Sequence, residues 1–149
     1  MMRSETNGGF LISQIKQVSG RIFERLLAEA GVDAFNGAQG RILYVLWQGD
    51  KAPIAELSKQ TGLAKTTLTS MLDRMEQSGL VRREFDKADR RQILISLTAE
   101  ARSLRGKYGD VSRKMSEIYY GGFEDAEIAV FEETLRRILG NLHQKEQST

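Results

Sequence analysis

Apolar side chains recur every three or four residues along most of the chain, a spacing that predicts amphipathic helices. The first such run lies between about residues 10 and 31, and Gly31 ends it. A second helix is predicted to begin at Asn36, because Asn36 and Gln39 have the spacing of a capping box. Its apolar positions, which we expect to face inward, are Ile42, Leu43, Leu46 and Trp47.

The stretch from residue 53 to residue 79 predicts two short helices joined by a tight turn. Pro53 suits the first position of a helix, because its missing N–H would have no intrahelical partner there. Gly62 lies where a sharp turn between two helices requires a residue that tolerates positive φ. Gly79 ends the second of these helices. The apolar face of that helix consists of Leu68, Met71, Leu72 and Met75.

Residues 80–85 and 92–97 are short runs with alternating apolar positions, and the residues between them are mostly charged. This pattern predicts a β-hairpin whose tip has the sequence Asp86-Lys87-Ala88-Asp89-Arg90-Arg91. An Arg on a hairpin beside a helix can enter a narrow minor groove, where the electrostatic potential of DNA is most negative. The predicted fold class is therefore mainly α with a small β-hairpin wing, a winged helix–turn–helix flanked by N- and C-terminal helices.

The second short helix carries small polar side chains on the face opposite its apolar stripe. These side chains are Thr66, Thr69, Ser70, Asp73 and Gln77, with Arg74 beside them and Lys65 at the start. Short hydrogen-bonding side chains suit close approach to base edges and phosphates in a major groove. The alternative interpretation is that Thr66 and Thr67 only cap the helix and that the remaining side chains are solvated.

Two further helices with narrow apolar seams are predicted after the hairpin. Thr98 can cap the first of them, and Glu100 in its first turn complements the helix dipole. The seam of this helix is formed by Ala101, Leu104, Tyr108, Val111, Met115 and Ile118. After Gly121 and Gly122, the seam of the last helix is formed by Ile128, Phe131, Leu135, Ile138 and Leu142. This apolar surplus implies a second copy of the chain; the alternative is that the two helices pair only with each other.

The run from Leu57 to Arg83, followed by Asp89-Arg90-Arg91 and the exit Leu97-Thr98, resembles the MarR family of bacterial transcriptional regulators. The resemblance covers residues 36 to 100 well, and the flanking helices match in length and position. It implies a single domain over residues 1–149, with a winged DNA-binding module at about 36–98. It also implies a homodimer built on dimerisation helices at about 10–31 and 98–145.

The family pattern, carried over residue by residue, assigns DNA contacts to the second short helix and to the wing. The helix residues that would contact base edges and phosphates are Lys65, Thr66, Thr67, Thr69, Ser70 and Arg74. In the wing, Arg90 would enter the minor groove and Asp89 would help to orient it by an ion pair. Arg91 would contact the DNA backbone or brace the wing. The chain departs from the commoner wing sequence at Ala88, where Pro is frequent, so we expect a more mobile tip.

The resemblance implies a transcriptional regulator that binds a pseudo-palindromic operator in double-stranded DNA, and repression is the commoner outcome in the family. Small aromatic acids are frequent effectors in the family, and Tyr44, Trp47 and Tyr108 are candidates for lining a ligand pocket. The alternative for these three aromatic residues is ordinary core packing. The rival function is a winged helix that docks a protein partner without binding DNA, although such a module has no need for Arg90 and Arg91.

The distribution of charge agrees with DNA binding more than its total does. The formal net charge of the 149 residues is only +2, so the protein is not a polybasic nucleic-acid coat. Residues 51–91 hold nine basic and six acidic side chains, whereas the remainder holds 13 basic and 14 acidic ones. The positive excess therefore lies on the predicted winged module, although an excess of this size can also arise by chance.

Several classes of site and location are disfavoured by the composition. The chain has no cysteine, which excludes a thiol metal site and the reactive-Cys oxidant sensing used by one branch of the family. With His143 as the single histidine and no glycine-rich phosphate-binding motif, we expect neither an enzyme nor a bound metal or cofactor. No apolar run approaches the roughly 18 residues that span a membrane, and the N-terminus lacks a signal-peptide core. We therefore expect a cytoplasmic protein without membrane contact.

Overall fold

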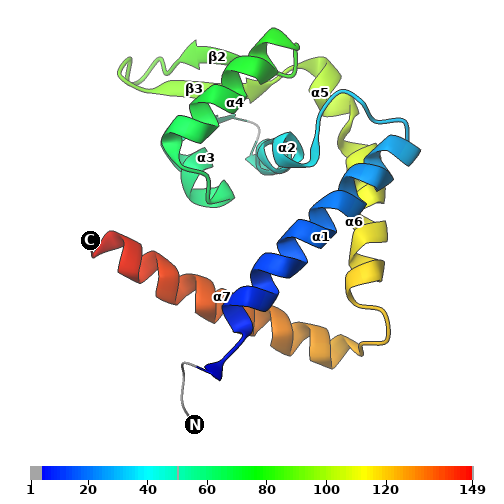
Figure 1. Cartoon of the computed structure of the whole chain (residues 1–149). Coiled ribbons are helices and arrows are strands. Elements are labelled where there is room, and N and C mark those ends of the chain that lie inside the picture. The colour runs from blue at the N-terminus through cyan, green and yellow to red at the C-terminus, as the bar shows by residue number, and fades with distance from the viewer. Residues whose placement is uncertain (1–4, 50, 149) are drawn as a thin grey trace. The chain divides into compact units, whose positions relative to one another are not determined.

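The computed structural model describes residues 5–49 and 51–148, and this part of the chain forms seven helices and three strands (Figure 1). One compact unit ends at Met115, and a second begins at Ser116. The helices are α1 (Gly8–Glu29), α2 (Gly37–Gly49), α3 (Ile54–Thr61), α4 (Lys65–Gln77), α5 (Ala99–Ser103), α6 (Arg105–Tyr119) and α7 (Asp125–Gln147). The strands are β1 (Lys51–Pro53), β2 (Val81–Phe85) and β3 (Ile93–Leu97). The winged helix–turn–helix predicted from the sequence is confirmed.

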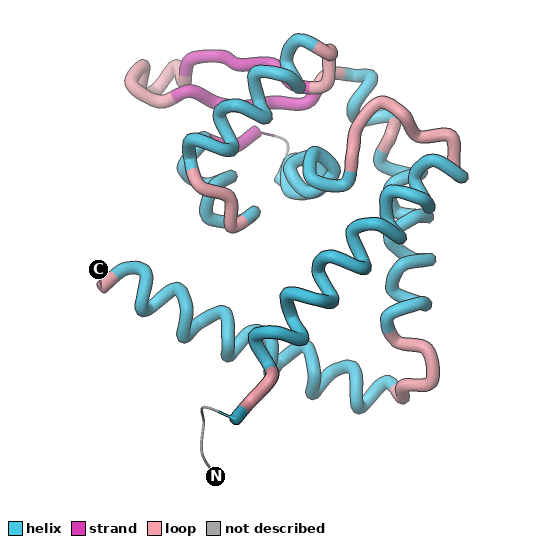
Figure 2. Tube along the Cα trace, in the orientation of Figure 1, coloured by secondary structure: helices cyan, strands magenta, loops and turns pink. Residues whose placement is uncertain are grey.

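The hairpin of β2 and β3 projects a loop beyond the helices, as Figure 2 shows. The sheet is antiparallel with strand order β1-β3-β2, and Val81 of β2 lies opposite Leu97 of β3. Strand β1 was not expected from the sequence, because three residues are too few to show an alternating pattern. It places Lys51 opposite Ser96 and so extends the hairpin to three strands.

Pro53 does not occupy the first helical position, and that prediction is wrong by one residue. Its backbone is extended, with φ −67° and ψ 154°, and it precedes Ile54, the first residue of α3. Pro53 lies opposite Leu94 of β3 in the register of β1. Because β1 is an edge strand, a residue without an N–H is tolerated there. Pairing with β3 therefore decides the conformation of Pro53.

The turns that follow α3 and α4 contain the two glycines predicted for them, in the predicted conformation. Gly62 has φ +77° and Gly79 has φ +81°, both in the left-handed region that favours glycine. The N–H of Gly62 donates to the carbonyl of Ser58 at 3.0 Å, and the Ser58 hydroxyl donates to the carbonyl of Leu63 at 2.6 Å. These bonds satisfy backbone groups in the short turn between α3 and α4 and so fix the angle between the two helices.

Both helix caps predicted for this unit are confirmed. Asn36 Oδ1 accepts from the N–H of Gln39 at 2.8 Å, and Gln39 Oε1 accepts from the N–H of Asn36 at 3.1 Å. Thr98 Oγ1 accepts from the N–H of Ala101 at 3.2 Å and donates to the carbonyl of Gly79 at 2.7 Å. The Thr98 hydroxyl therefore caps α5 and also joins it to the turn that follows α4.

One apolar core holds the winged module together. The side chains that are at most 1% exposed are Leu27, Ile42, Leu43, Leu46, Leu57, Leu68, Leu72, Met75, Leu80, Val81, Ile95, Ala101 and Val111. They come from the end of α1, from α2 to α4, from the hairpin, and from α5 and α6. The apolar face predicted for α4 thus lies in the core, apart from Met71, which is only partly buried.

The sequence predicted a single helix after Thr98, but the structure has two. The helix is interrupted at Leu104, between the end of α5 at Ser103 and the start of α6 at Arg105. The carbonyl of Ala101 accepts from Trp47 Nε1 at 3.0 Å and from the N–H of Leu104 at 3.2 Å. The indole of α2 therefore competes for a carbonyl that a continuous helix would use in its own ladder. A tighter turn at Leu104 results, and no local sequence pattern indicates it.

The apolar residues predicted to form a seam over residues 101–118 lie mostly in the core of their own chain. The prediction that this seam packs against a second copy of the chain is therefore corrected. Ala101 and Val111 are buried in the core of the module, and Met115 is 6% exposed. Only Ile118 at the end of the seam is exposed. The residues predicted for this face pack on their own chain because α2 and the end of α1 offer apolar side chains to them.

Apolar surface remains exposed on two helices, each considered by itself. On α1 the exposed apolar residues are Phe10, Leu11, Ile12, Ile15 and Val18. On α7 they are Val130, Phe131, Leu135, Ile138, Leu139 and Leu142. Within the described residues, α7 has no buried side chain although it is 23 residues long. In the unit that contains α7, Gly122 has φ +82° and the Tyr120 hydroxyl donates to Glu132 Oε2 at 2.8 Å.

Candidate nucleic-acid interface

Helix α4 presents a polar face because its other face is fixed in the core. Leu68, Leu72 and Met75 are fully buried and determine how the helix is rotated about its axis. The side chains predicted to contact DNA from this helix are all exposed: Lys65, Thr66, Thr67, Thr69, Ser70 and Arg74. Arg74 makes one weak contact along this face, from Nη2 to Ser70 Oγ at 3.5 Å.

In the described part of the chain, no side chain caps the first turn of α4. Its N-cap residue is Ala64, which is extended with φ −63° and ψ 148°. Thr66 and Thr67 therefore do not cap the helix, contrary to the alternative interpretation of their role. The N–H groups of a first helical turn have no intrahelical partner, and they favour an anion at that end. Lys65 adds a positive charge at the same place.

Arg83 of β2 links the hairpin to α4, a role that sequence reasoning missed. Its Nη2 lies 2.7 Å from Asp73 Oδ1, and its Nη1 lies 3.6 Å from Glu76 Oε1. Nη2 also donates to the carbonyl of Thr69 at 3.4 Å. Asp73 is therefore engaged by the wing. The signal in the sequence was an Arg at an inward position of a strand, two residues after Val81.

The wing tip is organised by hydrogen bonds to Asp86. Its Oδ1 accepts from the N–H of Ala88 at 2.9 Å, and its own N–H donates to the carbonyl of Gln92 at 3.0 Å. A proline at position 88 could not make the first of these bonds, because it has no N–H. The N–H of Ala88 thus helps to fix the conformation of the wing tip.

Asp89 pairs with Arg91, whereas the sequence led us to expect Arg90 as its partner. Its Oδ1 accepts from the N–H and from Nε of Arg91, each at 3.1 Å. The side-chain and backbone hydrogen bonds from Arg91 lower the pKa of the Asp89 carboxyl below 3.8. A carboxylate that bonds to the N–H two residues on closes a small local turn, which brings the Arg91 side chain to it.

Arg90 is exposed at the wing tip, and within the described residues it makes no hydrogen bond or ion pair. It lines an open hollow of about 490 Å³ together with Phe85, Asp86 and Lys87. The structure therefore leaves Arg90 available to a partner, whereas Arg91 braces the tip. Lys87 adds a second exposed cation beside Arg90.

Tyr44, Trp47 and Tyr108 lie close together, which is compatible with both interpretations, a ligand pocket and ordinary core packing. The ring centroids of Trp47 and Tyr108 are 5.2 Å apart, and those of Tyr44 and Tyr108 are 6.1 Å apart. Phe35 also contacts both Trp47 and Tyr108. Trp47 is 8% exposed, with its N–H bonded to Ala101, and burial raises the pKa of the Tyr108 hydroxyl. Trp47 is thus a core residue, while Tyr44 is exposed at the edge of the cluster.

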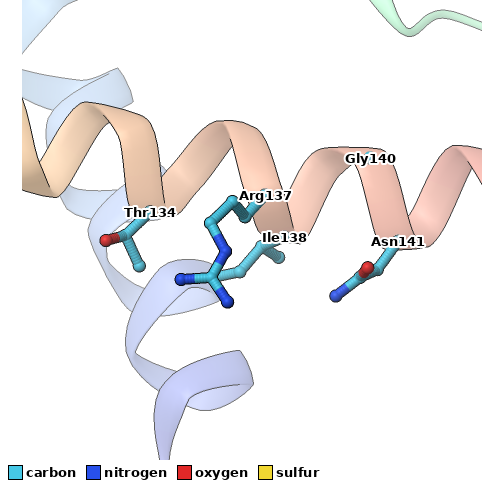
Figure 3. A pocket seen from close by; sticks show the side chains of 5 residues that line it. All are labelled: Thr134, Arg137, Ile138, Gly140 and Asn141. Atoms are coloured by element: carbon cyan, nitrogen blue, oxygen red, sulfur yellow. The ribbon is translucent and has the colours of Figure 1, made fainter.

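A second hollow, of about 420 Å³, lies along α7. The residues that line it are Thr134, Arg137, Ile138, Gly140 and Asn141. Figure 3 shows the side chains of Thr134, Arg137, Ile138 and Asn141 on the same side of the helix. A hollow with one helix as its wall offers no enclosed binding site, and we assign no ligand to it.

No group of three or more His, Cys, Asp or Glu side chains suitable for a metal is found within residues 5–49 and 51–148. In the same part of the chain, none of the helices is long and apolar enough to cross a membrane.

Comparison with known proteins identifies relatives along most of the chain. A family model described as MarR family matches residues 35–93. The organic hydroperoxide resistance transcriptional regulator of Bacillus subtilis is 34% identical over 103 residues, which cover 69% of each protein. The HTH-type transcriptional regulator TtmR of Methylorubrum extorquens is 36% identical over 98 residues, 66% of this chain and about half (49%) of that protein.

Solved structures similar to the chain include complexes with DNA. A cysteine-to-serine mutant of MarR from E. coli, complexed with operator DNA, is 25% identical with a TM-score of 0.79, over 88% of this chain and 92% of that one. Reduced AbfR bound to DNA is 27% identical with a TM-score of 0.72, over 95% of this chain and 96% of that one.

The buried face of α4, its exposed polar face and the Arg-tipped hairpin define a winged helix–turn–helix transcriptional regulator. With relatives and solved structures of this similarity, the chain belongs to the MarR family.

Proposed function

We propose that this protein binds a pseudo-palindromic operator in double-stranded DNA as a homodimer and thereby regulates transcription, most simply as a repressor. The winged module at about 36–98 would contact the DNA, and the helices at about 10–31 and 98–145 would form the dimer. The observation that carries the proposal is the pairing of an exposed small-polar face on α4 with an unpaired Arg90 at the hairpin tip.

In this proposal α4 lies in the major groove. Its side chains would make the base and phosphate contacts, and they are Lys65, Thr66, Thr67, Thr69, Ser70 and Arg74. Support comes from the uncapped first turn of α4, because free N–H groups and Lys65 together favour a phosphate there. Threonine and serine hydroxyls both donate and accept, so they suit base edges of either kind.

The wing would lie in the neighbouring minor groove, with Arg90 inserted. A narrow minor groove concentrates negative potential, and an Arg without an intramolecular partner loses no ion pair when it enters. Asp89 and Arg91 would hold the tip in shape for this contact, which is supported by their mutual hydrogen bonds. Arg91 would also lie near the DNA backbone.

A second copy of the chain would cover the exposed apolar residues of α1 and α7. Several exposed large apolar side chains on one helix are typical of an interaction site, and α1 and α7 each carry such a set. A two-fold dimer would present two α4 helices about one turn of DNA apart, roughly 34 Å, to two half-sites. The two-fold symmetry of the dimer would be matched by the symmetry of the operator.

Regulation by a ligand would act through the geometry of the dimer. A small aromatic effector that bound beside Tyr44, Trp47 and Tyr108 would bias the spacing of the two α4 helices, and so the affinity for DNA. The cluster joins α2 to α6 through ring contacts, which supports such a coupling. The chain contains no cysteine, so thiol oxidation is not its route of regulation. A regulator of this kind would work in the cytoplasm, where its operator lies.

The test is a gel-shift titration of the purified protein with duplex DNA over a range of salt concentrations. The proposal expects a complex of two chains per site whose affinity falls steeply with added salt. Lys65→Ala should reduce the magnitude of the slope of log K against log salt by about one, as expected for the loss of one phosphate contact. A protein that shifts no duplex even at low salt would contradict the proposal.

A further inference from the structure

The inner face of the hairpin continues beyond the core that it covers. On this face Val81 lies opposite Leu97, both buried, and the next pair outward includes Ile95, which is fully buried. The outermost pair is Phe85 opposite Ile93, with Phe85 69% exposed and Ile93 37% exposed. The apolar alternation of β3 thus extends one residue past the core, to Ile93, and Phe85 of β2 lies opposite it toward the wing tip.

This exposed pair is on the same face of the hairpin as Arg83, since alternate residues of a strand share a face. Arg83 reaches α4 at Asp73 and at the carbonyl of Thr69. Phe85 and Ile93 therefore lie on the α4 side of the wing, one step closer to the tip. A DNA strand that passes from the groove occupied by α4 to the groove occupied by the wing would pass along this side.

Cations flank the apolar pair. Lys87 and Arg90 line the same hollow as Phe85. The one acidic residue there, Asp86, has Oδ1 occupied by the N–H of Ala88 at 2.9 Å. The residues that line the hollow thus combine an exposed aromatic side chain with two cations and one carboxylate, so that positive charge is in excess.

A DNA strand has the complementary chemistry, because it alternates an apolar deoxyribose with a negatively charged phosphate. We propose that Phe85 and Ile93 bind a deoxyribose of the strand beside the wing, while Lys87 contacts an adjoining phosphate. This inference rests on the proposed function, and it adds to it a sequence-independent contact that holds the wing in register. Most phosphate and sugar contacts position a protein on the duplex without reading its sequence.

The contact can be recognised by its dependence on salt. An apolar contact to a sugar releases no counterion, so its loss lowers affinity by the same factor at every salt concentration. The loss of a lysine–phosphate contact instead changes the slope of log K against log salt by about one unit. Phe85 and Lys87 are therefore expected to differ in slope although they line one hollow.

The experiment measures the binding of a labelled operator duplex by fluorescence anisotropy at several salt concentrations. Phe85→Asn should bind roughly fivefold to tenfold more weakly with an unchanged slope, as expected for losing a partly buried aromatic contact. Phe85→Leu is the matched control and should stay within about twofold of the wild type, because it keeps an apolar side chain. Lys87→Ala should reduce the slope.

Other outcomes overturn the inference. If Phe85→Asn binds like the wild type at every salt concentration, no sugar contact exists. If Phe85→Asn instead changes the oligomeric state without DNA, the pair is an interface between copies of the chain. If Phe85→Asn weakens binding with a changed slope, it acts through the charges of the tip. If the wild-type protein binds no duplex at all, the proposed function itself is contradicted. This outcome differs from those that contradict only the sugar contact of Phe85.

Discussion

Replacing Arg83 with methionine removes the guanidinium that links the hairpin to α4 but keeps an aliphatic side chain of similar reach. We expect the Arg83→Met protein to fold with nearly wild-type stability and to bind DNA more weakly. Arg83 would then be a residue that positions the wing relative to α4. Its contribution to the free energy of unfolding would be small.

The small effect on stability follows from two opposing contributions. The ion pair to Asp73 is short, at 2.7 Å, but Asp73 is 55% exposed, so its loss costs only about 0.5–1 kcal/mol. The lost hydrogen bond to the Thr69 carbonyl adds about 0.5–1.5 kcal/mol. Against this, Arg83 Nε is buried without a hydrogen-bond partner among residues 5–49 and 51–148, a condition that costs about 1–3 kcal/mol and that methionine relieves. The two contributions nearly cancel, so we expect the free energy of unfolding to change by less than about 1 kcal/mol.

The effect on DNA binding has a different origin. Without Arg83, the carboxylates of Asp73 and Glu76 lose their counter-charge on the helix that faces the phosphates. The one positive charge that is lost, at about 8 Å from a phosphate, is worth ~0.5 kcal/mol in water, so its loss weakens the Kd about twofold. Loss of the link between hairpin and helix would add to this value.

Urea denaturation followed by circular dichroism gives the stability, and anisotropy with an operator duplex gives the affinity. Arg82→Met is the matched control, since Arg82 is exposed on the opposite face of the same strand. A loss of stability above about 3 kcal/mol would refute the cancellation, because it would show a buried charge pair that dominates. Unchanged DNA affinity would refute the positioning role.

Three further predictions concern the wing, the aromatic cluster and the dimer. Arg90→Ala should weaken operator binding by about 1–3 kcal/mol in an anisotropy titration, and unchanged affinity would remove the wing from the mechanism. Burial raises the pKa of Tyr108 above its ordinary value of 10.0, so the native state holds this proton more tightly than the unfolded state does. The stability from this group is fully present below pH 10 and is lost as pH rises through the higher native pKa, a loss that Tyr108→Phe should abolish in denaturation curves. Leu135→Asp on α7 should give a folded monomer by sedimentation, whereas a dimer of wild-type strength would place the interface elsewhere.

Features set by residues close in sequence could be predicted. Gly62 and Gly79 marked turns that need positive φ, and Asn36 with Gln39 marked a cap that forms as expected. The alternating pattern of the two long strands likewise predicted the hairpin. In each case the determining contacts lie within a few residues, so local chemistry decides the outcome.

Features that depend on residues distant in sequence could not be predicted. The break at Leu104 follows from a hydrogen bond between Trp47 and Ala101, which are 54 residues apart. Pairing of β1 with β3 likewise decides the conformation of Pro53. The contacts of Arg83 with α4 depend on how β2 and α4 are placed relative to each other, and the spacing of residues along the sequence does not give that placement. Asp89 pairs with Arg91 because the turn at the wing tip brings the N–H of Arg91 to the Asp89 carboxylate.

The most direct test is selection of bound sequences from a library of random duplexes, using the purified 149-residue protein. We expect enrichment of one inverted repeat whose half-sites are centred about 10 base pairs apart, because two α4 helices related by a two-fold axis would contact them. Enrichment of no sequence, or of a single half-site without symmetry, would contradict the central claim that a dimer of winged modules recognises operator DNA.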